Sequence, residues 1–123
     1  MTQKRILLGK KGEDLAIAKL RALKYKIIER NYKCALGEID IIAREKDTWV
    51  FVEVKTRATK DFGGPAAGVH EYKQRQLSKV ALMYLNQKKI SEVPARFDVV
   101  AVELISPSPK IEVIRNAFDL LYG

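Results

Sequence analysis

The chain has 123 residues, of which 47% are hydrophobic and 31% are charged, and it contains one cysteine. This length and composition predict a single folded domain over residues 1–123, and they exclude a disordered tail or a disulfide scaffold. The apolar run at residues 6–8 is too short for a secretory signal or a membrane span. The shortness of this run and the single cysteine, Cys34, together predict a cytoplasmic protein without membrane association.

The chain is strongly basic, with a formal net charge of +8. A charge of this size favours association with a polyanion, either nucleic acid or an acidic membrane face. Purely structural nucleic-acid binders are also basic, and a solvated basic surface explains the charge equally well. Charge therefore indicates a class of partner without indicating an activity.

The first half of the chain predicts one helix followed by three strands. Apolar residues recur at helical spacing from about Gly9 to Leu23, where Gly12 weakens the first turn. Three segments rich in β-branched or aromatic residues then predict the strands Lys26–Tyr32, Glu38–Ala43 and Trp49–Lys55. The last is apolar at nearly every position, which is typical of a central strand covered on both faces.

The second half begins with a Gly-rich segment, Ala58–Val69, that predicts a mobile loop. One apolar stripe predicts a second helix from about Glu71 to Gln87. A strand at Phe97–Leu104, an edge strand at Ile111–Ile114 and a helical turn at Ala117–Leu121 complete the expected elements. The pattern indicates the α/β class.

The charged residues of the second and third strands form the main candidate site. Strand side chains alternate between faces, so Glu38 shares a face with Asp40, and Glu53 shares a face with Lys55. The simplest antiparallel register turns at residues 46–47. It places Asp40 opposite Glu53 and Glu38 opposite Lys55.

Burying unpaired charges among apolar strand residues would reduce the stability of the fold by roughly several kcal/mol. Lys55 balances one carboxylate, and a hard cation with oxygen ligands would balance the others, so we expect Mg²⁺ or Mn²⁺. His70 and Cys34 are single residues, which argues against zinc. The alternative is a salt-bridged polar patch with a purely structural role. Such a role rarely explains charged residues on matched faces of two neighbouring apolar strands, so the sequence favours the metal site.

Two helices contribute further candidates. Glu13 shares a helix face with Ala16 and Ile17 and should point toward the sheet, although an acid in a first helical turn also interacts favourably with the helix dipole. Lys73 and Gln74 lie one turn before the apolar stripe of the second helix and are placed to reach the same cleft. A solvated helix start is the alternative for both.

Asp40 followed by Glu53-Val54-Lys55 resembles the PD-(D/E)xK motif of restriction-endonuclease-like proteins. Longer strings, covering nearly the whole chain, resemble the YraN-like family of small bacterial proteins. In chain order they are Gly12-Glu13, Arg30-Asn31, Gly37-Glu38-Ile39-Asp40, Phe51-Val52-Glu53-Val54-Lys55-Thr56-Arg57 and Arg96-Phe97-Asp98. Ile39 replaces the proline that names the motif, and Tyr32 stands where the family often has Trp.

The resemblance implies a restriction-endonuclease-like fold, with a central mixed β-sheet flanked by helices, akin to archaeal Holliday-junction resolvases. It also implies a nuclease that hydrolyses DNA, including branched or structured DNA. The rival is a basic nucleic-acid-binding module that keeps the fold without cutting, and a protein-interaction subunit ranks third. A homodimer, which would allow both strands to be cut, is left open.

As a hypothesis, Asp40, Glu53 and the Val54 carbonyl hold the metal ion, and Lys55 orients the attacking water or stabilises developing charge. Glu38 or Glu13 completes the shell or helps to hold a second ion. Phosphate contacts would be sequence-independent and salt-sensitive. The residues expected to bind nucleic acid are Arg57, Lys60, Lys73, Gln74, Arg75 and Lys79.

Overall fold

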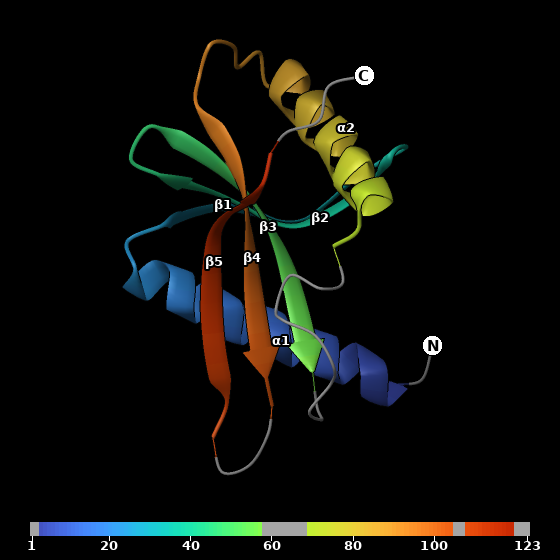
Figure 1. Cartoon of the computed structure of the whole chain (residues 1–123), viewed down its shortest axis with the longest axis vertical. Helices are drawn as coiled ribbons and strands as arrows, with labels where there is room; N and C mark the ends of the chain where they lie inside the picture. The colour runs from blue at the N-terminus through green and yellow to red at the C-terminus, as the bar shows by residue number, and fades with distance from the viewer. Residues whose placement is uncertain (1–2, 58–68, 105–107, 120–123) are drawn as a thin grey trace.

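The computed structural model describes residues 3–57, 69–104 and 108–119, with side chains described from residue 7 onward. Two helices and five strands make up this part of the chain (Figure 1). In order they are α1 (Gln3–Ala22), β1 (Lys26–Cys34), β2 (Gly37–Glu45), β3 (Thr48–Arg57), α2 (Glu71–Gln87), β4 (Ala95–Glu103) and β5 (Lys110–Phe118). Neither helix, over the residues described, is long and apolar enough to cross a membrane.

The five strands form one mixed sheet in the order β1-β2-β3-β4-β5. All neighbours are antiparallel except β3 and β4, which are parallel. A parallel pair needs a crossover connection, and the segment containing α2 supplies it. The expected mixed sheet with flanking helices is therefore confirmed, as is the position of β5 at an edge.

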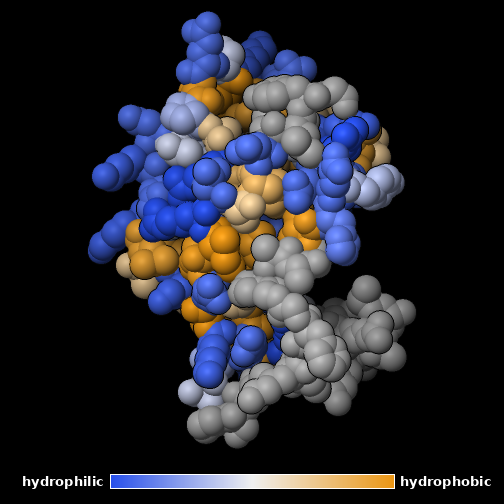
Figure 2. All heavy atoms as spheres, viewed as in Figure 1, coloured by the Kyte–Doolittle hydropathy of each residue, from blue (hydrophilic) through white to orange (hydrophobic). Residues whose placement is uncertain are grey.

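The helices pack in different layers, on opposite faces of the sheet (Figure 1). Ala16, Ile17 and Leu20 of α1 pack with Val50 and Val52. Leu77, Val80 and Tyr84 of α2 pack with Phe51 and Phe97. Because alternate residues of β3 enter the two clusters, the prediction of a central strand covered on both faces is confirmed. Figure 2 shows hydrophilic residues over much of one molecular face, with apolar residues visible between them.

Most element boundaries differ modestly from the sequence prediction. α2 spans Glu71–Gln87 as expected, whereas the expected start of α1 at Gly9 is wrong, because the helix begins at Gln3 and runs through both glycines. Tertiary packing overrides the poor helix propensity of glycine here, since Gly12 is buried against β3. The strands extend one or two residues further than predicted at most ends, and β5 extends four residues further at its C-terminal end.

The expected helical turn at Ala117–Leu121 is wrong at its start, because Ala117 and Phe118 continue β5. The rings of Phe118 and Phe97 stack, with 4.6 Å between their centroids, and this contact favours the extended backbone. Residues 120–121 lie outside the described part. So does the expected loop at Ala58–Val69, apart from Val69, which is buried.

Candidate functional site

The register of β2 and β3 is the one expected from the sequence. Ile41 pairs with Val52 and Glu45 with Thr48, so the strands turn at residues 46–47. The ladder stops at Ile41, and the next residue, Asp40, lies where the strands separate. Its Oδ2 accepts a hydrogen bond of 2.8 Å from the Val54 amide, which places its carboxyl group beside β3.

Asp40 and Glu53 form a carboxyl pair, which we call the acid pair. Glu53 is buried, and its side chain shares a hydrogen bond with Asp40. Burial raises the pKa of Asp40 to about 8, and the hydrogen bond to Glu53 and the charge of Glu53 act in the same direction. The Val54 amide opposes this shift. The acid pair therefore holds a proton at neutral pH.

Two lysines approach Glu53. Lys73 Nζ of α2 lies 3.4 Å from Glu53 Oε2, and Lys55 Nζ lies 4.0 Å from the same oxygen. The predicted shared face of Glu53 and Lys55 and the predicted reach of Lys73 are both confirmed. The sequence predicted that Lys73 reaches the cleft but did not identify Glu53 as its partner. The acid pair is thus better balanced by positive charge than the sequence alone suggested.

Glu13 lies on α1, in the other layer, and its carboxylate contacts β1. Its Oε1 accepts a 3.2 Å hydrogen bond from Asn31 Nδ2 and lies 3.5 Å from an Arg30 nitrogen. Its charge also contributes to the raised pKa of Asp40. The expected inward orientation is confirmed. The helix-dipole alternative is wrong, because α1 begins at Gln3 and Glu13 lies in the middle of the helix.

The expected convergence of Glu38 with the other acids is wrong. Glu38 is exposed and lies opposite Lys33 of β1. Ile39 packs in the α2 cluster while Ile41 packs in the α1 cluster, so the regular alternation of β2 breaks between them. Glu38 and Asp40 consequently do not share a face as a regular strand would require.

The remaining candidates for nucleic-acid binding on α2 differ in their surroundings. Gln74 Nε2 donates a 2.9 Å hydrogen bond to the Val69 carbonyl, so its amide is directed to the start of α2. Arg75 is exposed and pairs with Glu71 at 2.8 Å, and Lys79 is exposed. Arg75 and Lys79 are therefore open to solvent, whereas the Gln74 amide makes a local contact.

Arg57 ends β3, two residues after Lys55, and is half-buried. Its carbonyl accepts a 2.7 Å hydrogen bond from Leu104, which extends the pairing of β3 with the segment that follows β4. Lys60 lies outside the described residues.

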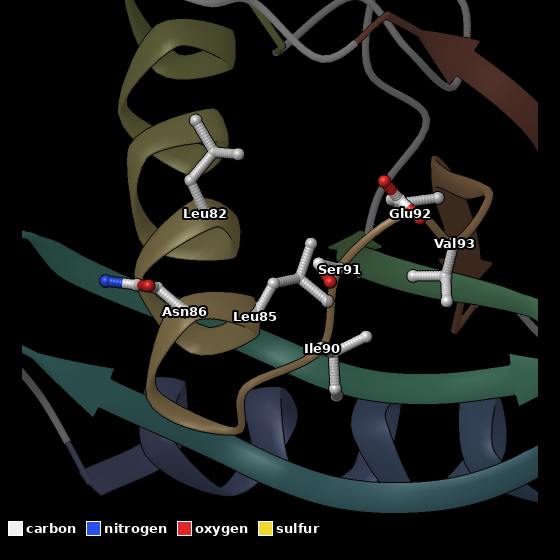
Figure 3. Close-up of a pocket in the computed structure, with 8 residues that line it drawn as sticks. Leu82, Leu85, Asn86, Ile90, Ser91, Glu92 and Val93 are labelled. Atoms are coloured by element: carbon white, nitrogen blue, oxygen red, sulfur yellow. The ribbon is translucent and has the colours of Figure 1, made fainter.

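A hollow of about 320 Å³ lies at the C-terminal end of α2 (Figure 3). Its walls come from α2 and from the segment that follows the helix, and they include Leu85, Ile90 and Val93. Glu92 is the one ionisable side chain that lines it, and none of the candidate site residues does. The hollow is therefore separate from the acid pair.

The acid pair offers oxygen ligands only, which suit a hard cation such as Mg²⁺ or Mn²⁺ and not zinc. A cation bound at Asp40 would take the place of the proton that the raised pKa of this group favours. Within the described ranges, no three His, Cys, Asp or Glu side chains are grouped closely enough to hold a metal ion by themselves. A metal would therefore need backbone or solvent oxygens as well, or a movement of Glu13 toward the pair.

Comparison with known proteins identifies relatives along almost the whole chain. A UPF0102 protein of Geobacter sulfurreducens is 54% identical over 117 residues, covering 94% of this chain and 91% of its own. A UPF0102 protein of Syntrophus aciditrophicus is 50% identical over 115 residues, covering 94% of this chain and 91% of its own. One of Thermodesulfovibrio yellowstonii is 47% identical over 114 residues, covering 93% and 97%.

The model of the family described as "Uncharacterised protein family UPF0102" matches residues 12–102. The match includes Asp40 and Glu53 of the acid pair, the neighbouring Lys55 and Lys73, and Glu13 of α1. The chain belongs to the UPF0102 family.

Proposed function

We propose that this protein is a divalent-metal-dependent nuclease of the restriction-endonuclease-like fold, acting on DNA and in particular on branched or structured DNA. One observation carries the proposal: the half-buried carboxyl group of Asp40 and the buried carboxyl group of Glu53 form a pair beside Lys55, where β2 and β3 separate. Such a combination of acids and a lysine on one sheet suits hydrolysis of a phosphodiester bond.

In this proposal Asp40, Glu53 and the Val54 carbonyl hold Mg²⁺ or Mn²⁺. The ion would polarise the scissile phosphate and lower the pKa of a coordinated water. Lys55 orients that water through its ammonium group or stabilises the developing negative charge. Lys73, which pairs with Glu53, would contact a neighbouring phosphate once Glu53 binds the metal.

The five-stranded mixed sheet with a helix on each face is compatible with a restriction-endonuclease-like fold. The net charge of +8 supports nucleic acid as the partner. The single cysteine, Cys34, is free and fits a reducing compartment, which supports the cytoplasm as the location. A pair of chains would supply the two sites that cleavage of both strands needs.

Cleavage assays test the proposal. Wild-type protein with Mn²⁺ or Mg²⁺ should cut branched, flapped or single-stranded DNA, and Asp40→Asn, Glu53→Gln and Lys55→Ala should each lower the rate by about 100-fold or more. Glu112→Gln on the exposed surface of β5 is the matched control and should cut like wild type. Cleavage that survives all three site substitutions, in folded protein, would rule the proposal out.

The second candidate is a nucleic-acid-binding module that does not cut. Lys55 and Lys73 favour this candidate, because their positive charges lie beside the Glu53 carboxylate and can balance its negative charge without a metal ion. Calorimetry separates the candidates: the nuclease should bind Mn²⁺ and lose this binding in Glu53→Gln. The module should bind no Mn²⁺ and should show salt-dependent DNA binding that Glu53→Gln leaves unchanged.

A further inference from the structure

Tyr72, the second residue of α2, is the most exposed aromatic side chain in the described part of the chain. Its exposed fraction is 80%, whereas the other described aromatic side chains are buried or half-buried, and most of them pack against another ring. Among the residues that the structure describes, no ring contact and no hydrogen bond holds Tyr72. Its ring is therefore available to a planar partner from outside the chain.

Tyr72 lies on the side of α2 that faces away from the sheet. Helix residues three, four or seven positions apart share one side, and this spacing joins Tyr72 to three exposed residues. The outer face of α2, as we call it, consists of Tyr72, Arg75, Gln76 and Lys79. The α2 residues that pack on the sheet lie on the opposite side of the helix.

The outer face carries positive charge that contacts within the fold use only in part. Arg75 pairs with Glu71 at 2.8 Å, but an exposed pair of this kind is weak. No acidic group of the described residues pairs with Lys79. An open aromatic ring beside cations, on a chain with a net charge of +8, is the combination that binds single-stranded nucleic acid.

A hollow of about 500 Å³ continues the outer face along α2. Its apolar walls come from Leu36, Leu82 and Met83, and Lys79 and Asn86 supply polar groups. Seven residues separate Lys79 from the start of the outer face, so the hollow begins about two helical turns further on. A nucleotide has the matching chemistry, because it joins an apolar base face to a charged phosphate. The hollow gives a bound strand a path along the helix.

The outer face begins beside the acid pair. Lys73, the residue after Tyr72, points to the sheet, and its Nζ lies 3.4 Å from Glu53 Oε2. Consecutive helix residues advance by only about 1.5 Å along the axis. A strand whose phosphate lies at Lys73 therefore has a neighbouring nucleotide within reach of the Tyr72 ring.

We propose that Tyr72 stacks on an unpaired nucleobase of DNA, next to the phosphate that Lys73 contacts. This inference deepens the proposed function and rests on it for DNA as the partner. Bases inside a duplex stack on one another and offer no free face to a side chain on the protein surface. Tyr72 therefore selects DNA that contains unpaired nucleotides, such as a single strand, a flap or an open junction.

DNA binding in EDTA tests the assignment without a metal ion. Tyr72→Ala should lower the affinity for a labelled single strand by about 5-fold or more and leave the affinity for a duplex of equal length unchanged. Tyr72→Phe keeps the ring and should bind both like wild type. Leu7→Ala removes an exposed side chain from α1, on the opposite layer, and is the matched control (Figure 1). It should also bind like wild type.

A single abasic nucleotide locates the contact. In a duplex with a short single-stranded flap, which fixes the register, it should weaken binding by wild type most at one flap position. In Tyr72→Ala the same abasic nucleotide should have no further effect, because ring and base act through each other. Lys79→Ala should instead weaken binding of single strand and duplex alike and reduce the salt slope by about 1.

The outcomes separate this inference from the proposed function. If wild type cleaves DNA and Tyr72→Ala binds single strands like wild type, the inference fails and the nuclease proposal stands. An equal loss for single strand and duplex also overturns the inference, because Tyr72 then does not distinguish them. If Tyr72→Ala loses single-strand binding but wild type with Mn²⁺ cuts no DNA, the stacking role stands and the nuclease proposal fails. Wild type that binds no DNA overturns both, and the outer face then fits a protein partner.

Discussion

The carboxyl group of Asp40 is held in its protonated form by the fold. Its pKa is about 8 in the folded chain against an ordinary value of 3.8, because burial and the neighbouring Glu53 disfavour its charge. A group whose pKa is raised on folding binds its proton more tightly in the folded state. The folded chain therefore loses stability as the pH rises from about 4 to about 8.

Asp40→Asn should accordingly stabilise the protein at high pH. The amide resembles the protonated carboxyl, does not ionise and can still accept the Val54 amide hydrogen bond. The gain in free energy of unfolding should be small at pH 5 and exceed about 1 kcal/mol at pH 9, or roughly 4 °C in the melting temperature. Thermal unfolding in EDTA at both pH values measures it.

Asp47→Asn in the exposed turn between β2 and β3 is the control for this experiment. Its unfolding curve should follow wild type at both pH values. A difference between Asp40→Asn and wild type that stays constant from pH 5 to pH 9 would contradict the raised pKa.

At the scale of elements, the contact between α1 and β3 decides where Glu13 lies. The two glycines of α1 differ in their surroundings: an added Cβ at Gly12 would meet Thr56, whereas one at Gly9 would meet nothing within 4 Å. Helix propensity favours alanine over glycine at both positions by about 1 kcal/mol. Packing and propensity therefore oppose one another at Gly12 only.

Gly12→Ala should destabilise the protein by about 1–3 kcal/mol, as overpacking does, because the helix must move away from β3. Gly9→Ala should instead stabilise it by about 0.5–1 kcal/mol. Urea unfolding of the two variants measures both signs. The Thr56→Ala background should remove much of the penalty at Gly12, and a Gly12→Ala variant as stable as Gly9→Ala would show that the helix is not held closely.

At the scale of the whole molecule, a buried polar cluster ties β4 and β5 to the end of α1. Asp98 is fully buried and accepts hydrogen bonds from the Tyr25 hydroxyl at 2.7 Å, from Arg96 Nε at 2.9 Å and from the Asn116 amide at 2.9 Å. Arg96 also pairs with Glu45 at 2.7 Å. Burial, aided by the hydrogen bond to Asp98, raises the pKa of Tyr25 to about 12, so Tyr25 remains a donor.

Asp98→Ala should lower the free energy of unfolding by about 3–5 kcal/mol, because it leaves the hydroxyl of the buried Tyr25 without its acceptor and removes one of the two carboxylates that pair with the half-buried Arg96. Glu71→Ala, which breaks the exposed pair with Arg75, should change it by less than about 1 kcal/mol. Chemical denaturation compares the two. Equal effects would show that the Asp98 cluster does not hold the strands together.

The sequence alone determined the features that depend on local periodicity. The turn at residues 46–47 and the alternation of faces set the register of β2 with β3, and the apolar stripe set the bounds of α2. The apolar run of Trp49–Lys55 identified the central strand. These patterns act over a few residues, so they are visible without knowledge of the fold.

Only the tertiary structure decided how the charged residues are grouped. Glu38 left the predicted cluster and Asp40 moved between the layers because one residue of the neighbouring strand, Asn31, has a positive φ. Lys73 joined Glu53 because α2 packs over that end of β3. The structure thus groups Asp40 and Glu53 as an acid pair that Lys55 of β3 and Lys73 of α2 approach. The contact with Lys73 joins residues distant in sequence, and it depends on packing that no local pattern records.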